Sequence, residues 1–250
     1  MSHDDTPDAL YTQDDSIANV LDHVARAHRI LEMEGQGDMS MGHLSYRDPF
    51  GRGLWLKRGN LGLEEVRGGD FILIDFDGNV LEGQGLRHLE WPLHAEIMRA
   101  RPDVNVVGHS HPFYATVFGA STAELRPVHN HAVWFAEHGV PRFSATSHIV
   151  TTPELGRDVA QVLGDAEAVL LAHHGVAFVG RTVRDATLAG IFLEWSAKVQ
   201  LTLSSSGLPY DVPDQAESVE KNLRIHPDRA RDNYWMYFNR KLDRLERTTR

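Results

Sequence analysis

The sequence predicts a single domain of the α/β or α+β class, built around one β-sheet. The 250 residues are enough for one large domain with a substantial core. Short apolar segments bounded by turn residues occupy the middle of the chain, and segments with helical spacing of apolar residues flank them. No internal repeat or low-complexity linker divides the chain. We therefore expect residues 15–250 to form the domain, including a C-terminal helical extension, after a flexible tail at residues 1–14.

The first expected helix covers residues 15–34, where apolar side chains recur at helical spacing. Asp15 or Ser16 can cap its first turn, because short polar side chains accept hydrogen bonds from unpaired backbone N–H groups. Gly35 and Gly37 follow its last turn, as is common at helix ends. The same criteria place further helices at residues 89–100, 153–164, 182–204 (long and amphipathic) and 228–246.

Short strands separated by turn residues are expected between these helices. Asp77-Gly78, inside the apolar stretch 70–83, is a strong hairpin signal. Residues 103–112 predict a buried strand, because valines dominate the run and Pro112 ends it. The other expected strands lie in residues 42–48, 53–59, 132–146 and, on either side of a turn at His174-Gly175, 166–180.

Composition excludes several classes of function. The net charge is −10, and the one stretch rich in Lys and Arg is the short C-terminal tail, which acidic residues interrupt, so nucleic-acid binding is not expected. No apolar run reaches the roughly 18 residues that a membrane span needs. The acidic, polar N-terminus lacks the pattern of a signal peptide. The chain has no cysteine, which rules out disulfides and thiolate metal sites and fits a cytoplasmic enzyme.

Histidine is the unusual residue in this composition: there are 15, and 10 of them lie between His88 and His174. Two follow the apolar run of the strand at 103–112, in the segment VVGHSHPF. Because alternate residues of a strand share a face, His109 and His111 present two imidazoles side by side. The pair is either part of a metal site or two hydrogen-bonded histidines at a strand end.

A second apolar strand that ends in histidines favours the metal. The segment LLAHHG places His173 and His174 before Gly175, which suits a tight turn with positive φ. Three neutral imidazoles with one open position are typical of a catalytic metal site, but the residues alone do not choose between the two histidines. Glu90 begins the helix that leads into the other strand. It is either a fourth ligand or acid/base beside the metal, or an ordinary glutamate at a helix N-terminus.

These segments together resemble the class II aldolase/adducin family. The resemblance covers roughly residues 16–205 and implies a central, mostly antiparallel β-sheet covered by helices on both sides. Three motifs carry it, in family order: GHLSYRD at 42–48, LEWPLHAEIMRARPDVNVVGHSHP at 89–112 and LLAHHGVAFVG at 170–180.

The resemblance also implies the composition of the site. It assigns one divalent transition metal ion per subunit to His109, His111 and His174. His173 then becomes a neighbour of the metal site and not a ligand. Zinc is the usual metal in the family, and manganese and iron are alternatives. The family's acid/base glutamate falls on Glu90.

Family members are commonly homotetramers with active sites between subunits, so residues near the C-terminus can complete a neighbour's site. Tyr234 and Tyr237 are the candidates for that role. The alternative is that both side chains simply pack the last helix against the domain.

The chain departs from the sugar-phosphate aldolases where that branch binds phosphate through a GN-S motif, a Thr-x-x-Gly turn and a Ser-Ser pair. Here the first motif reads GHLS, the turn region reads WLKRGNLG, and Arg87-His88-Leu89 precede Glu90. Cationic side chains pair well with carboxylates, so we expect a small carboxylic acid as substrate, although each of these residues can also be an ordinary surface group. The expected substrate-binding residues are His43, Ser45, Lys57, Arg58, Arg87, His88, His129, His131 and Tyr234.

This pattern looks like the family branch with decarboxylases of aromatic or heteroaromatic acids and iron-dependent oxygenases. The leading hypothesis is a metal-dependent carbon–carbon lyase that decarboxylates a hydroxylated aromatic or keto (di)carboxylic acid through a metal-stabilised enolate. The alternatives are an Fe(II)- and O2-dependent oxygenase, and a sugar or sugar-phosphate aldolase, epimerase or dehydratase. A non-enzymatic module is also possible in this family, but such proteins are expected to lose the metal histidines.

Overall fold

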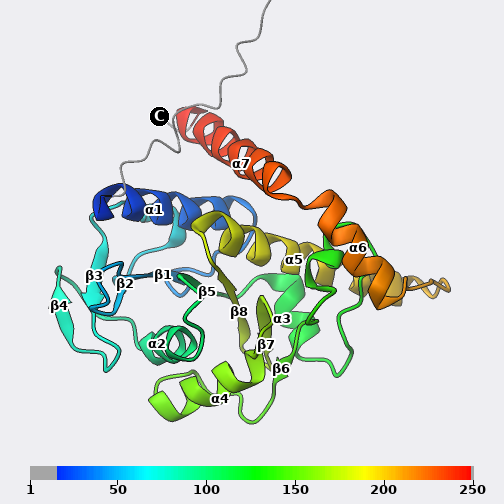
Figure 1. Cartoon of the computed structure of the whole chain (residues 1–250), viewed down its shortest axis with the longest axis horizontal. Helices are drawn as coiled ribbons and strands as arrows, with labels where there is room; N and C mark the ends of the chain where they lie inside the picture. The colour runs from blue at the N-terminus through cyan, green and yellow to red at the C-terminus, as the bar shows by residue number, and fades with distance from the viewer. Residues whose placement is uncertain (1–15, 249–250) are drawn as a thin grey trace, which may run out of the picture.

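The computed structural model describes residues 16–248 and consists of three layers, with one β-sheet between two layers of helices (Figure 1). The strands are β1 His43–Arg47, β2 Leu54–Lys57, β3 Phe71–Ile74, β4 Val80–Glu82, β5 Val106–Ser110, β6 Arg142–Phe143, β7 Ala168–Leu171 and β8 Gly175–Gly180. Their order in the sheet is β4-β3-β2-β1-β5-β8-β7-β6, and every neighbouring pair is antiparallel except β6 with β7. This confirms the predicted fold class. The expected tail at 1–14 lies outside the described residues.

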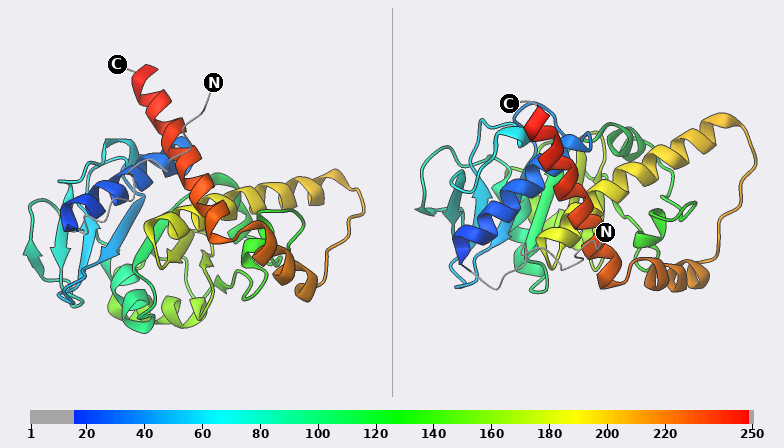
Figure 2. Two further views of the ribbon diagram at one scale, coloured as in Figure 1. Left: turned by 45° about the horizontal axis from the view of Figure 1, so that its top comes forward. Right: turned by 90° about the horizontal axis from the view of Figure 1, so that it is seen from above.

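Helices cover both faces of the sheet (Figures 1 and 2). They are α1 Ile17–Met33, α2 Trp91–Ala100, α3 Phe113–Gly119, α4 Pro153–Leu163, α5 Val183–Ser206, α6 Gln215–Ile225 and α7 Asp228–Thr248, with short 3-10 helices η1 Leu63–Glu65 and η2 Ala132–Phe135. Buried side chains of α1, α3, α5 and α7 form one core with the sheet, and those of α2 and α4 form a second core on the opposite face. The sheet therefore separates two apolar cores.

The pleat of β5 decides which side chains reach which core. Val106 and, on β8, Phe178 pack toward α1 and α5, whereas Val107 packs toward α2 and α4. His109 follows Val107 on the same face, so its imidazole points to the α2 side of the sheet. Gly108 lies between them, and a Cβ added there would be 2.1 Å from the Phe178 ring. The glycine therefore leaves room for the Phe178 ring to lie over β5, at the residue before His109.

Most predicted elements are present, with boundaries that shift by a few residues. The side chain of Ser16 caps α1, and the hairpin between β3 and β4 turns at Gly78 with φ 85°. Neither α3 nor α6 was expected from the sequence. The apolar run Ala132–Phe135, expected to be a strand, forms η2 instead, because its backbone pairs within its own turn and not with the sheet.

Helix α5 also differs from the expected amphipathic helix. Nearly all of its residues from Ala186 to Ala197 are buried. The reason is its position: α5 lies between the sheet on one side and α1 and α7 on the other (Figure 1). Even so, within residues 16–248 no helix combines the length and the apolar character that crossing a membrane requires.

Candidate metal centre

Three histidines converge where β5 ends and the turn between β7 and β8 begins. His109 is the fourth residue of β5, His111 follows the last residue of that strand, and His174 lies in the turn. One ring nitrogen from each lies within 4.8 Å of the corresponding nitrogens of the other two. We call His109, His111 and His174 the three-histidine centre. The strand spacing thus correctly places two of its members together.

The turn before β8 explains why this backbone brings His174 to the centre. His173, not Gly175, carries the positive φ of the turn, at 62°, so the conformational reason expected for Gly175 is wrong. Gly175 is instead needed for space. A Cβ there would lie 2.4 Å from the His111 ring and 2.6 Å from the carbonyl oxygen of Ser110. His173 is exposed and His174 is partly buried, so the two adjacent histidines have different surroundings.

Hydrogen bonds fix how two of the imidazoles point. Nδ1 of His109 lies 2.9 Å from the carbonyl oxygen of Val176, and Nδ1 of His111 lies 2.9 Å from Oδ2 of Asp38. Both partners accept hydrogen bonds, so each Nδ1 donates a proton and each Nε2 faces the centre. The two Nε2 atoms are 3.1 Å apart. Two lone pairs at this distance repel each other unless a cation lies beside them, and the donor set therefore fits a divalent metal ion with an open position.

Glu90 supplies the negative charge of this site. It is the N-cap residue of α2, is only 5% exposed, and places Oε2 3.3 Å from Nε2 of His109 and Oε1 3.6 Å from Nε2 of His174. Oε1 also accepts a hydrogen bond of 3.1 Å from the backbone N–H of Val150. Burial alone raises the pKa of the Glu90 carboxyl, but attraction to His109 and His43 outweighs it and holds the pKa well below its usual range.

The pKa of His109 shows the same attraction for positive charge. Burial lowers this pKa, but the Glu90 carboxylate beside the ring raises it by more, so the net shift is upward. The space between the two side chains therefore favours a cation, whether a proton or a metal ion.

Two further histidines lie on the other side of Glu90. His43 stands opposite His109 in the β1–β5 pairing, and its Nε2 is 3.7 Å from Oε2 of Glu90. The His88 ring packs against the His43 ring with 3.7 Å between centroids. Burial, with a smaller effect from the Lys57 ammonium, lowers the pKa of His88 to about 4. Both sequence-predicted residues thus lie at the candidate site as neutral imidazoles.

Two residues that sequence reasoning did not assign support these side chains. His94 places Nε2 2.6 Å from Nδ1 of His43 and Nδ1 2.7 Å from Oγ of Ser45. It lies one helical turn after Glu90 on the same face of α2, a spacing that could have revealed it. Asp38, the partner of His111, lies in the loop after α1, and no sequence pattern pointed to it.

The three predicted cationic residues make structural contacts. Lys57 is fully buried and donates to the carbonyl oxygens of Ser40 and Leu61, and burial lowers its pKa to about 8. Arg58 pairs with Asp70 at 3.0 Å. Arg87 donates to the carbonyl oxygen of Gly78, and its guanidinium lies 5.1 Å from the Trp91 ring centroid. In this chain, the described contacts of Lys57, Arg58 and Arg87 are therefore with other protein groups.

The remaining predicted residues, His129, His131 and Tyr234, lie with a further histidine, His226, on the opposite side of the sheet. We call His129, His131 and His226, near η2 and α6, the α5-face cluster. His131 stacks on Phe192 of α5, with centroids 4.5 Å apart and ring planes at 11°. Tyr234 donates from its hydroxyl to the carbonyl oxygen of Ile225 at 3.3 Å and packs near Phe192. The exposed Tyr237 packs against Phe238. Within this chain, these side chains do not join the three-histidine centre.

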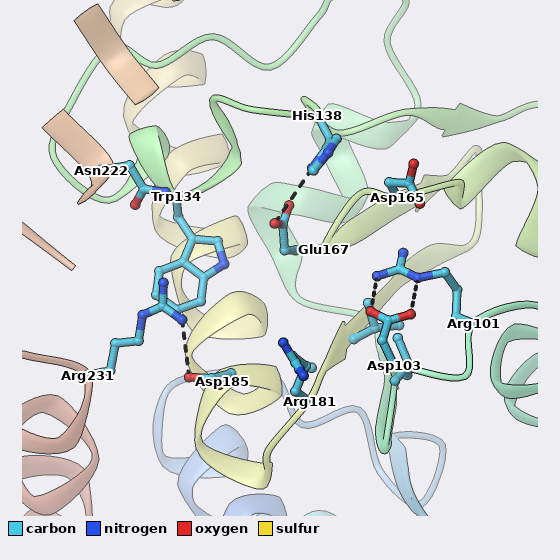
Figure 3. Close-up of a pocket in the computed structure, with 13 residues that line it drawn as sticks. Arg101, Asp103, Trp134, His138, Asp165, Glu167, Arg181, Asp185, Asn222 and Arg231 are labelled. Atoms are coloured by element: carbon cyan, nitrogen blue, oxygen red, sulfur yellow. Dashed lines mark hydrogen bonds and ion pairs between the residues drawn. The ribbon is translucent and has the colours of Figure 1, made fainter. Parts of the chain in front are cut away.

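A cavity of about 400 Å³ lies at the other end of β5 and β8, near Val104 and Gly180 (Figure 3). Charged side chains line it, and several are already paired: Arg101 with Asp103, and Arg231 with Asp185. None of the residues of the three-histidine centre lines this cavity. The three-histidine centre and this cavity are therefore at separate places.

The chain matches the family described as Class II Aldolase and Adducin N-terminal domain over residues 22–201, and it belongs to this family. It is 32% identical over 203 residues to a 3,4-dihydroxyphthalate decarboxylase of Arthrobacter keyseri, covering 76% of this chain and 82% of that protein. It is 30% identical over 207 residues to a 5-methylthioribulose-1-phosphate/5-deoxyribulose-1-phosphate aldolase of Rhodospirillum rubrum, covering 82% of this chain and 90% of that protein.

Among solved structures, an L-fuculose 1-phosphate aldolase from Glaciozyma antarctica PI12 superposes with a TM-score of 0.82 at 23% identity, covering 98% of this chain and 94% of that one. This likeness shows the fold. Family, relatives and donor groups together define the class of protein: it is an enzyme, a metal-dependent lyase of the class II aldolase family.

Proposed function

We propose that this lyase decarboxylates a hydroxylated aromatic acid or a keto (di)carboxylic acid. The observation that carries the proposal is the pair His43 and His88 beside Glu90, at positions where the sugar-phosphate aldolases have small polar residues that hold a phosphate. The similarity to a dihydroxyphthalate decarboxylase over most of both chains supports it.

In this proposal His109, His111 and His174 hold one divalent ion per subunit, zinc by family precedent, with manganese and iron as alternatives. When bound, such an ion would act as a Lewis acid and stabilise the negative charge that develops on a substrate oxygen. The carbonyl of Val176 and the carboxylate of Asp38 keep two of the imidazoles oriented toward the ion.

Glu90 moves the proton. Its low pKa keeps it ionised, so it can accept the proton of the substrate hydroxyl. The bond to the carboxylate carbon then breaks, CO2 leaves, and the electron pair stays on the substrate carbon. Glu90 returns its proton to that carbon, so protons and electrons balance without an oxidant. Burial lowers the pKa values of His43 and His88, so both rings are neutral near pH 7 and can form hydrogen bonds with the substrate.

The test is CO2 release under anaerobic conditions from a panel of hydroxylated phthalates, related aromatic acids and keto acids. We expect release with metal-loaded protein and none after the metal is removed by a chelator. No release across the panel from metal-loaded protein contradicts the proposal. Turnover that requires O2 and consumes it would indicate the alternative oxygenase reaction.

Aldol cleavage of a sugar phosphate is a second candidate, favoured by the similarity to the Rhodospirillum rubrum aldolase. An ion held by His109, His111 and His174 would supply the same chemistry here, by stabilising the negative charge that develops on a substrate oxygen. Incubation with ketose 1-phosphates and detection of the released aldehyde tests it. Aldehyde release without decarboxylation of any acid in the panel would favour this candidate.

We also propose that the enzyme works as a homotetramer in the cytoplasm, as the family resemblance and the lack of cysteine suggest. Light scattering on the purified protein measures the assembly state directly. A monomer with full activity would exclude a requirement for active sites between subunits, including any role of Tyr234 in a neighbour's site.

A further inference from the structure

We propose that the chain binds a second divalent cation next to the three-histidine centre, held by His43, His88 and Glu90. One ligand atom from each of these residues lies within 4.8 Å of the other two, as is also true of the three-histidine centre. Imidazole nitrogens with one carboxylate oxygen suit a transition-metal ion.

Unpaired ring nitrogens are the first evidence for this site. His43 is fully buried, and its Nε2 has no hydrogen-bond partner among the described residues. Nδ1 of His88 is likewise buried without a partner in that part of the chain. A buried nitrogen without a partner destabilises the folded state, so a native site normally gives such nitrogens a partner. A cation between the two rings and Glu90 would provide it.

The hydrogen-bond pattern behind His43 is the second evidence. His94 can accept the proton of Nδ1 of His43 across the 2.6 Å contact, which leaves the lone pair of Nε2 facing Glu90. The opposite arrangement would point an N–H of His43 at Oε2 of Glu90 over 3.7 Å, too far for a hydrogen bond. A cation beside Glu90 would select the arrangement with the lone pair on Nε2, which repeats that of His109 and His111, where a partner behind the ring orients the ligand nitrogen.

Glu90 connects the two groups of ligands. Oε1 faces His174 at 3.6 Å, whereas Oε2 lies 3.3 Å from His109 and 3.7 Å from His43. One carboxylate with ligands on both sides can bridge two cations, as in two-metal sites with ions about 3.5–4 Å apart. A second ion would occupy the lone pairs that Glu90 uses to accept protons. Excess metal should therefore inhibit the reaction assigned above.

The experiment loads metal-free protein with Mn²⁺ by equilibrium dialysis and measures ions per chain by elemental analysis. Electron paramagnetic resonance then shows whether the bound ions are magnetically coupled, because only neighbouring ions couple. We expect two coupled ions per chain in the wild type, and one uncoupled ion in His88→Ala. His148→Ala, which removes an exposed histidine, is the matched control and should keep two coupled ions.

His43→Asn is a second variant, with circular dichroism to confirm that it folds, and it should also retain one uncoupled ion. The inference is overturned if the wild type saturates at one ion per chain or if His88→Ala keeps a coupled pair. The inference rests on the proposed function, because the second ion would lie next to the three-histidine centre, but the two proposals can fail separately. A chain that binds no Mn²⁺ at all contradicts both, whereas a single uncoupled ion contradicts the second site alone.

Discussion

The three-histidine centre and the α5-face cluster contain the same residue type but differ in what faces the imidazole nitrogens. In the centre, the nitrogens facing away from the shared space bond to Val176 and Asp38, and a carboxylate faces the other nitrogens. In the α5-face cluster, His131 and His226 pack on aromatic rings, and the structure describes no carboxylate within ion-pair distance of either. The comparison teaches that a buried carboxylate facing the ring nitrogens, more than the abundance of histidine in the sequence, distinguishes a candidate metal centre from a cluster of packed rings.

The largest expected effect comes from removing the charge that distinguishes the centre. Glu90→Gln keeps the shape and the hydrogen bond from Val150 but cannot accept a proton. We expect turnover to fall by about 10²- to 10⁴-fold, the usual contribution of a general acid/base. The metal at the three-histidine centre should remain. Activity within a few-fold of the wild type would show that another group transfers the proton.

The partners behind the rings allow a matched test of the comparison. Asp38→Asn weakens the support of His111, and we expect metal affinity to fall by about 10- to 100-fold. Asn222→Ala removes the partner of Nδ1 of His226 in the α5-face cluster and should leave metal affinity unchanged. Calorimetric metal titrations of the two variants measure both values. Equal losses of metal affinity in the two variants would contradict the distinction between the clusters. A loss only in Asn222→Ala would place the metal in the α5-face cluster instead.

The sequence predicts part of the centre because local rules govern it. The period of a strand places His109 and His111 together, and the resemblance chooses His174 over His173. The choice agrees with the position of His174 at the turn. Asp38 could not be predicted, because its approach to His111 depends on the path of an irregular loop.

Other errors have equally physical causes. Gly175 is a glycine because the His111 ring and a neighbouring carbonyl leave no room for a side chain, which depends on tertiary packing. The run at 132–135 has the composition of a strand, but it lies away from the sheet and closes on itself as η2. His131 stacks on an aromatic ring of the core on the other face of the sheet, so this chain alone does not bring it to the three-histidine centre.

The α5-face cluster should affect how the stability of the fold depends on pH in the acid range, and it should not affect metal binding. Burial, with smaller effects from His131 and Arg231, lowers the pKa of His226 to about 4, against about 6.5 in an unfolded chain. Its contribution to stability is present above pH 6.5 and is lost as the pH falls toward 4, because only the unfolded state takes up the proton in that window. Thermal unfolding of His226→Asn should therefore depend less on pH between 6.5 and 4.5 than that of the wild type. An unchanged slope would contradict this.

The smallest expected effect is at Tyr234. Tyr234→Phe removes one partly buried hydrogen bond to the carbonyl of Ile225 and keeps the ring contacts with Phe192. We expect a loss of about 0.5–1.5 kcal/mol in the free energy of unfolding, measured by urea denaturation, and no change in metal affinity. A large loss of turnover with normal stability would instead place Tyr234 in an active site, including that of a neighbouring subunit.

The most direct test of the central claim compares the two adjacent histidines of the β7–β8 turn. His174→Ala removes one proposed ligand, whereas His173→Asn changes its exposed neighbour to a residue that also tolerates positive φ. The measurement is tightly bound metal per chain after dialysis, with circular dichroism to confirm folding. The three-histidine centre predicts that His174→Ala loses this metal and that His173→Asn keeps it. Full metal retention in folded His174→Ala would contradict the centre.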